Sequence, residues 1–233
     1  MILAYILFVI ASYLFGSVPF MILIGRLRGF DLSRELDLHQ ALWHKVGRMW
    51  GALGVLLDIL KGVLPVLAGL MLQFPLYVTV LGGLAALCGQ MWPVFRKFNG
   101  ERGNTTGLGI VLTLTIALGV PFIVIIAVGL AAIGFIIRTI NRRQMIGHSL
   151  NELTKFRGPP SMALPLGVLV GFSSCPVTSA LAGQPLEVTL GFATIVVLIL
   201  IRRLTAGLRQ DLSSSNKPGS VIINRLLFDR SEI

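Results

Sequence analysis

The sequence is poor in charge and in cysteine. Only 13% of its 233 residues are charged and 55% are hydrophobic, whereas soluble domains carry about 25% charged residues. So few polar side chains cannot cover a water-soluble globule, which excludes a soluble enzyme or a soluble binding domain. Two cysteines, Cys88 and Cys175, do not make the disulfide framework of a secreted domain. We expect both to be small side chains inside the protein, without a bridge.

Acidic residues are scarce as well. The chain has ten Asp and Glu residues and 20 Lys and Arg residues, so its formal net charge is +10. In a soluble protein this excess would suggest a nucleic-acid partner. Membrane proteins, however, collect Lys and Arg in their cytoplasmic loops. We therefore expect contact with membrane lipids and no nucleic-acid partner.

The N-terminus lacks the marks of a signal peptide. Residues 1–12 contain no basic side chain, and the apolar run continues through Ile24 without an A-x-A-like cleavage site. That run is too long for a signal sequence and suits a membrane-spanning helix.

Apolar runs recur along the whole chain. We predict an all-α, polytopic membrane bundle with about seven spans, in which residues 1–205 form a single membrane domain and residues 206–233 a cytoplasmic tail, either flexible or folded. The predicted spans are residues 2–24, 50–72, 76–95, 105–118, 121–137, 161–175 and 188–201. Gly119 and Pro121 divide the uncharged stretch 105–137 into two of these helices.

The basic residues support seven spans. Nineteen of the 20 Lys and Arg lie in every second connection, at 25–49, 96–104 and 138–160, or in the tail from Arg202 onward. The connections near 73–75, 119–120 and 176–187 contain none. By the positive-inside rule, the N-terminus is outside and the C-terminus is cytoplasmic.

Lys61 is the one basic residue within a predicted span. It follows Asp58 by three residues, so the two side chains are neighbours on one helical face. Charged groups facing lipid are costly, and both should point into the bundle. Two interpretations stay open, a structural intramembrane pair or a direct role in binding a ligand.

A glycine-punctuated loop follows the third span. It runs from Pro93 to Gly107, and glycines at 100, 103 and 107 permit tight turns that expose backbone N–H groups. Thr105 and Thr106 can cap the following helix and donate hydroxyls, and Arg102 offers a fork suited to phosphate. The loop is therefore a candidate phosphate cradle, the alternative being an ordinary Gly-rich turn with a surface arginine.

Three motifs resemble those of a known family. Residues 13–20 (Tyr-Leu-Phe-Gly-Ser-Val-Pro-Phe) match Y-L-x-G-S-I/V-P-F, and residues 57–66 match L-D-x-x-K-G-x-x-P-V. Residues 89–109 match G-H-x-F/W-P-V-F-x-K-F-x-G-G-K-G-x-A-T-x-x-G with several changes. In order and spacing, the chain resembles the bacterial integral-membrane acyl-phosphate:glycerol-3-phosphate acyltransferases.

The resemblance implies an activity. Members transfer a fatty acyl group from acyl phosphate to glycerol 3-phosphate, giving lysophosphatidic acid for phospholipid biosynthesis at the bacterial inner (plasma) membrane. It implies no cofactor and no metal, and it leaves the catalytic residues of this chain unknown. The candidate phosphate- and substrate-binding residues are Gly100, Arg102, Gly103, Thr105, Thr106, Lys61 and Ser17.

The sequence also departs from the family pattern. Residues 33–41 stand where the family has G-S-G-N-x-G-A-T-N, and the polar Ser, Asn, Thr and Asn of that motif are all replaced in this chain. Gln90 replaces a His, Glu101 a Gly and Arg102 a Lys, while residues 201–212 show no match to the C-terminal His and Asn. The alternative function is therefore a catalytically degenerate member that binds lipids or a partner. A transporter or channel would need more polar residues along its spans.

Two histidines of the first basic loop are possible substitutes for the missing motif. His39 and His44 lie five residues apart in a basic loop, a pattern more typical of exposed surface than of a catalytic site. A tail segment, Val221–Phe228, is apolar with basic neighbours, and it either lies on the membrane surface or is disordered.

Overall fold

A computed structural model describes residues 1–33, 35, 38–146, 163–208, 212–213 and 218–228. All regular structure within these residues is helical. The principal elements are α1 (Ile2–Ser17), α2 (Phe20–Leu27), α3 (Leu38–Ala41), η1 (Leu42–Val46), α4 (Arg48–Met71), α5 (Leu76–Met91), η2 (Val94–Arg96), α6 (Asn104–Ala117), α7 (Phe122–Ile146), α9 (Ala163–Leu181), α10 (Leu186–Thr205) and α12 (Pro218–Phe228).

Each of the seven predicted apolar segments contains a helix. The predicted break in the stretch 105–137 is confirmed, because α6 ends at Ala117, Gly119 has a φ of +71° and α7 begins at Phe122. Some predicted bounds differ from those of the helices. Helix α7 continues into the expected loop 138–160 as far as Ile146, and residues 147–162 lie outside the described part.

The sixth predicted segment was too short at its C-terminal end. We expected it to stop at Cys175, but α9 passes through Pro176 and ends at Leu181. The turn that follows contains Gly183 in the left-handed region, at a φ of +63°, which is where a helix ends readily. Cys175 and Cys88 are both free, as expected.

The first predicted span is broken. Proline at position 19 cannot donate a backbone hydrogen bond to α1, and α1 and α2 meet there at an angle of 42°. The bend turns α2 toward α4, which it contacts. It also brings Phe20 to the end of the bundle that holds the charged loops.

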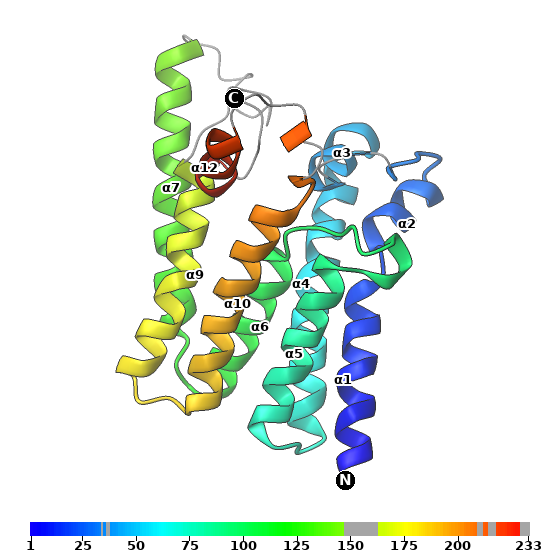
Figure 1. Cartoon of the computed structure of the whole chain (residues 1–233), viewed down its shortest axis with the longest axis vertical. Helices are drawn as coiled ribbons and strands as arrows, with labels where there is room; N and C mark the ends of the chain where they lie inside the picture. Colours follow the sequence, from blue (N-terminus) through cyan, green and yellow to red (C-terminus); the bar gives the residue numbers. More distant parts are fainter. Residues whose placement is uncertain (34, 36–37, 147–162, 209–211, 214–217, 229–233) are drawn as a thin grey trace.

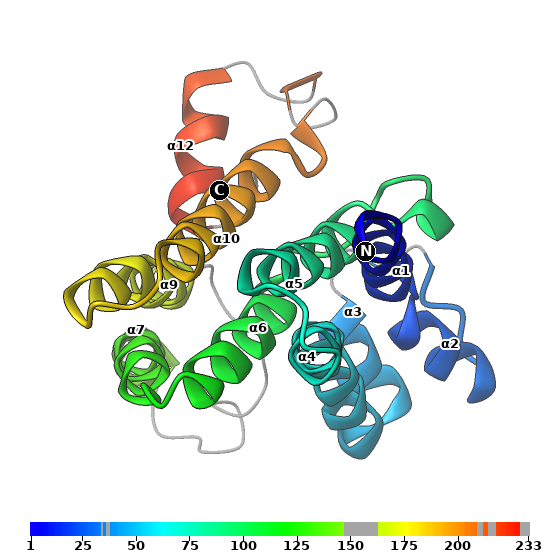
Figure 2. The same ribbon diagram turned by 90° about the horizontal axis from the view of Figure 1, so that it is seen from below.

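The helices run up and down in one bundle. Figure 1 shows the turns α4–α5, α6–α7 and α9–α10 at the same end as the N-terminus, with α2, α3 and α12 at the other end. Seen along the bundle, α5 and α6 are central, with α1 and α7 on opposite sides (Figure 2). The main core packs residues of α5, α6, α9 and α10 together, including Leu87, Ile110 and Phe192.

Glycines let neighbouring helices approach closely. A Cβ at Gly62 of α4 would lie 2.1 Å from the backbone oxygen of Thr106, and one at Gly109 of α6 would lie 2.2 Å from the oxygen of Ile59. Small residues at helix crossings are typical of membrane bundles, where packing replaces the hydrophobic effect. This crossing fixes α4 against α6 directly beside the candidate loop.

The surface of the bundle is apolar over much of its length. Among the described residues, three helices are long and apolar enough to cross a membrane, namely α4, α5 with the short η2, and α10, and the bent pair α1–α2 makes a fourth if it is one span. The shorter apolar helices are 104–117, 122–137 and 165–181. Large exposed hydrophobic side chains, among them Leu7, Ile125 and Leu190, give these helices a surface that suits lipid.

The tail contains a helix, α12, that contacts α9 and α10. Arg225 of α12 is buried and donates hydrogen bonds to the carbonyl oxygens of Arg203 and Ala206 at the end of α10. Residues Val221–Phe228, for which the sequence left two interpretations open, are helical in the structure. Residues 214–217 of the tail lie outside the described part.

Candidate functional site

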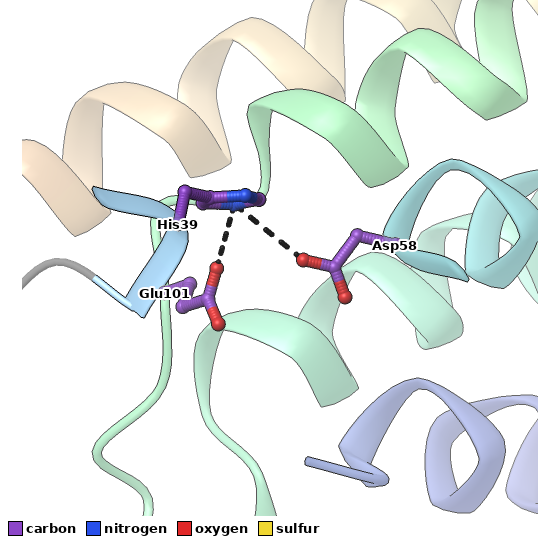
Figure 3. Close-up of side chains that lie close together, drawn as sticks. All are labelled: His39, Asp58 and Glu101. Carbon is purple, nitrogen blue, oxygen red and sulfur yellow. Dashed lines mark ion pairs between the residues drawn. The ribbon is translucent and has the colours of Figure 1, made fainter. Parts of the chain in front are cut away.

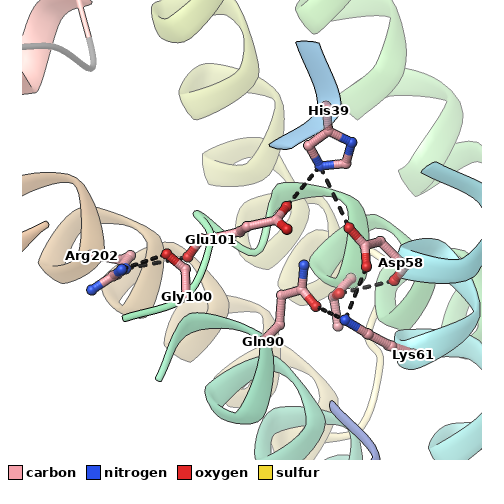
Figure 4. Close-up of polar contacts among 8 residues, drawn as sticks. His39, Asp58, Lys61, Gln90, Gly100, Glu101 and Arg202 are labelled. Carbon is pink, nitrogen blue, oxygen red and sulfur yellow. Dashed lines mark hydrogen bonds and ion pairs between the residues drawn. The ribbon is translucent and has the colours of Figure 1, made fainter. Parts of the chain in front are cut away.

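The intramembrane charge pair lies inside the protein. Lys61 and Asp58 are 3% and 1% exposed, and Lys61 Nζ is 3.0 Å from Asp58 Oδ1. The same ammonium donates a hydrogen bond to Gln90 Oε1 of α5 and lies 5.3 Å from the ring centre of Phe20. Gln90, which replaces a histidine of the family motif, thus has a definite role as the acceptor for Lys61 (Figure 4).

The predicted phosphate loop packs against the end of α5. The backbone N–H of Glu101 donates to the oxygen of Gln90 at 3.1 Å. A Cβ at Gly100 would lie 2.2 Å from that same oxygen, so only glycine permits this approach. Gly103 has a φ of +75° and forms the N-cap of α6, which begins at Asn104.

Arg202 holds the loop from its other side. This side chain, buried near the end of α10, donates from Nε to the Glu101 oxygen at 3.3 Å and also to the Gly100 oxygen (Figure 4). A further hydrogen bond reaches Asn99 Oδ1 at 3.3 Å. Because a guanidinium presents several donors in a fixed plane, one side chain fixes three consecutive residues of the loop.

His39 lies beside the charge pair and is not a surface residue like His44. Helix α3 buries Leu38 and Ala41, and His39 points toward α4 and the loop (Figure 3). Its Nε2 is 3.0 Å from Glu101 Oε2 and 3.5 Å from Asp58 Oδ2. An imidazole and two carboxylates are donor groups that bind divalent metals.

Burial by itself would raise the pKa of Glu101. The hydrogen bond and charge of His39, with the charges of Lys61 and Arg96, outweigh burial and lower that pKa below its usual range. Glu101 is therefore a carboxylate in a loop that the sequence assigned to anion binding.

The structure brings together only some of the predicted site residues. Lys61, Gly100 and Gly103 surround the Glu101 turn, and Arg102 is half-buried within it. Thr106 is fully buried, and its hydroxyl donates to the Asp58 carbonyl oxygen at 2.9 Å, linking α6 to α4. Ser17 is also buried, and its hydroxyl donates to the carbonyl oxygen of Tyr13 within α1.

One predicted role of the threonines was wrong. Neither Thr105 nor Thr106 caps α6, because the N-cap is Gly103 and no side chain makes a capping hydrogen bond there. The two residues lie one and two positions inside the helix, after its first residue. The hydroxyl of Thr106 is occupied by α4, while Thr105 is half-buried in the first turn.

A family model described as glycerol-3-phosphate acyltransferase matches residues 6–142, which contain Ser17, Asp58, Lys61 and the whole loop. The chain belongs to this family. Glycerol-3-phosphate acyltransferase 4 of Dehalococcoides mccartyi is 27% identical over 97% of this chain and 89% of its own length. The corresponding enzyme of a Synechococcus strain is 32% identical over 78% of this chain and 86% of its own length.

Solved structures with the same fold come from PlsY (YgiH), an integral membrane glycerol 3-phosphate acyltransferase. Its glycerol 3-phosphate form aligns with a TM-score of 0.63 at 23% identity, over 90% of each chain. Its lysophosphatidic acid form aligns with a TM-score of 0.64 at 23% identity, over 91% of this chain and 93% of that one. Acyltransferase-family membership and the membrane-bundle fold thus agree with the resemblance read from the motifs.

Of three participants in this site, sequence reasoning assigned no role to Glu101 or Gln90, and it named His39 as a substitute for the missing motif but favoured exposed surface. Two of them had been noted only as departures from the family pattern. The signal available in the sequence was that Gln90 and Glu101 occupy motif positions, so their side chains must lie near the motif residues. For His39 the chain offered no comparable signal, because α3 is a four-residue helix.

Proposed function

We propose that this protein transfers a fatty acyl group from acyl phosphate to glycerol 3-phosphate, forming lysophosphatidic acid and inorganic phosphate. The glycerol hydroxyl oxygen attacks the acyl carbon, the bond from that carbon to the phosphate oxygen breaks, and the hydroxyl proton leaves with the phosphate. The observation that carries this proposal is the loop 99–103, held by Arg202 at the end of the bundle beside Lys61. Family membership supplies the reaction.

Cationic groups suit such chemistry because both substrates carry phosphate and negative charge develops on the attacked carbonyl oxygen. We infer that Arg102 binds phosphate, with backbone N–H groups around Gly100 and Gly103 assisting. The other candidate substrate-binding residues under this proposal are Lys61, Thr105, Thr106 and Ser17. The hydroxyls of Thr106 and Ser17 donate to backbone carbonyl oxygens, which favours structural contributions from these two residues.

The proposed membrane topology has seven spans, formed by α1 with α2, α4, α5, α6, α7, α9 and α10. The N-terminus is outside the bacterial inner membrane, and the loop, α3 and the tail 206–233 are cytoplasmic, next to a single membrane domain 1–205. The common position of the three uncharged turns supports this arrangement (Figure 1). It puts the site on the side where phosphorylated substrates are made.

A second candidate function is a degenerate relative that binds lipids or a partner without catalysis. The carboxylate of Glu101 in the phosphate loop favours it, since a negative charge opposes phosphate binding. The two candidates differ in turnover. Purified protein given palmitoyl phosphate should release phosphate only when glycerol 3-phosphate is present, and it should rescue a bacterial strain that lacks its own acyl-phosphate-dependent enzyme.

Arg102 provides the matched variants. Arg102→Lys restores the residue of the family motif and should keep most of the activity, whereas Arg102→Ala should lower kcat/KM about 100- to 1,000-fold, the range for losing one charge-stabilising donor. Arg26→Ala, on the exposed side of α2, is the control and should behave as the unmodified protein. Phosphate release no greater than from a mock preparation would leave the degenerate relative as the function.

A further inference from the structure

Three side chains from separate parts of the chain converge on one point. His39 comes from α3, Asp58 from α4 and Glu101 from the loop before α6 (Figure 3). One ligand atom from each, an imidazole nitrogen or a carboxylate oxygen, lies within 4.8 Å of the others. Ligands bound to one ion at about 2.0–2.2 Å lie roughly 3–3.5 Å apart, and His39 Nε2 is 3.0 and 3.5 Å from the two carboxylate oxygens.

The carboxylate oxygens of this cluster are held mainly by ion pairs. Both oxygens of Asp58 and Oε2 of Glu101 are buried, and their contacts with Lys61 and His39 do not have the geometry of regular hydrogen bonds. Lys61 approaches Asp58 Oδ1, while Oδ2 faces His39. Two carboxylates that share one imidazole in a largely buried site favour compensating positive charge, of which Lys61 supplies one unit beside Asp58.

We propose that His39, Asp58 and Glu101 bind a divalent cation of the Zn²⁺ or Mn²⁺ class. One imidazole and two carboxylates form a donor set suited to these borderline cations. Lys61 pairs with the other oxygen of Asp58 and so orients that carboxylate. Residues that contact metal ligands without binding the metal commonly have this role. The family resemblance implied no metal, so this site goes beyond what the motifs predicted.

The cation would also account for Glu101. In the proposed function this loop receives phosphate, and a carboxylate there is repulsive unless a cation reverses the local charge. Three protein ligands leave coordination positions open, to which a phosphate oxygen of a substrate can bind. This last role rests on the proposed acyltransferase activity, whereas the metal site itself does not.

The test is metal binding by the full-length protein in detergent, measured without substrate. After chelator treatment, the protein is dialysed to equilibrium against Zn²⁺ or Mn²⁺ alone, and the bound metal is determined by elemental analysis. We expect one ion per chain. His39→Ala and Glu101→Gly should each weaken binding at least about tenfold, and His44→Ala, an exposed histidine five residues from His39, should bind as the unmodified protein does.

Several outcomes overturn the proposal. It is wrong if the unmodified protein binds neither ion, which would identify His39 as an imidazolium that bridges the carboxylates. It is also wrong if both variants bind as tightly as the unmodified protein. Glu101→Gly carries the family's own residue and serves if His39→Ala does not fold. Metal binding without phosphate release would refute the acyltransferase function alone, and phosphate release without metal binding would refute this site alone.

Discussion

The Arg202 guanidinium donates a hydrogen bond to the backbone oxygen of Gly100, a residue 102 positions earlier in the chain. The family model ends at residue 142, so Arg202 fixes a motif loop from outside the matched region. Although the C-terminal motif of the family has no clear counterpart here, its segment still supplies a contact to the site. Four predictions follow from such contacts.

Arg202→Ala should release the loop 99–101 from α10. We expect kcat/KM to fall about 10- to 100-fold, because a displacement of about 1 Å in a positioning group has an effect of that size. Arg202→Lys should recover only part of the loss, since an ammonium cannot reproduce the contacts from Nε and the terminal nitrogen. Limited proteolysis checks the cause, because cleavage between Asn99 and Arg102 should accelerate in the alanine variant.

Lys61→Met should destabilise the protein by about 3–5 kcal/mol, because it leaves Asp58 as a buried charge without its partner. Adding Asp58→Asn to the same variant should recover part of that loss. The control is Lys45→Met, which removes an ion pair between Glu35 and a lysine whose side chain is 53% exposed. This variant should change stability by less than about 1 kcal/mol. Unfolding titrations in mixed micelles give these values, and equal effects of the two lysine variants would contradict the buried pair.

Gly62→Ala should separate α4 from α6. The added methyl would lie 2.1 Å from the Thr106 oxygen and 2.8 Å from the Ile110 nitrogen, both backbone atoms that cannot turn away. We expect a loss of about 1–3 kcal/mol. Gly129→Ala in α7 is the matched control, because nothing lies within 4 Å of its Cβ position, and it should be neutral or slightly stabilising. Melting temperatures decide the point, and an unchanged value for Gly62→Ala would mean that the helices are farther apart.

Thr106→Val removes the hydroxyl that joins α6 to the Asp58 carbonyl oxygen. We expect a loss of about 0.5–1.5 kcal/mol, the usual net value of one hydrogen bond, with KM for glycerol 3-phosphate little changed. Thr115→Val is the control, since that hydroxyl bonds oxygens within its own helix, and its effect should be smaller. A higher KM with an unchanged melting temperature would instead assign the Thr106 hydroxyl to the substrate.

Local patterns predicted most of the helices. The end of α6 near Gly119 and the Asp58–Lys61 spacing depend on residues at most a few positions apart, so the sequence contains the required information. The end of α9 was misjudged because Pro176 was taken as part of a turn. The helix accommodates it, and the turn instead contains Gly183 with its left-handed backbone.

The site itself depended on contacts between distant residues. Lys61 and Gln90 are 29 positions apart, and the contact of His39 with Glu101 requires α3 to pack across α4. Nothing in the pattern around His39 distinguishes it from His44, yet His39 is half-buried and contacts two carboxylates, whereas His44 is exposed. The resemblance identified the correct loop, while the functions of the substituted residues became evident only in three dimensions.

The uncharged turns at the N-terminal end also have an electrical consequence. In the proposed orientation, the basic residues lie on the negative side of an energised inner membrane. Carrying one elementary charge against a potential of 100 mV costs about 2.3 kcal/mol. With a net charge of +10 in the chain, the respiring cell's own voltage opposes inversion of the protein and keeps its site facing the cytoplasm.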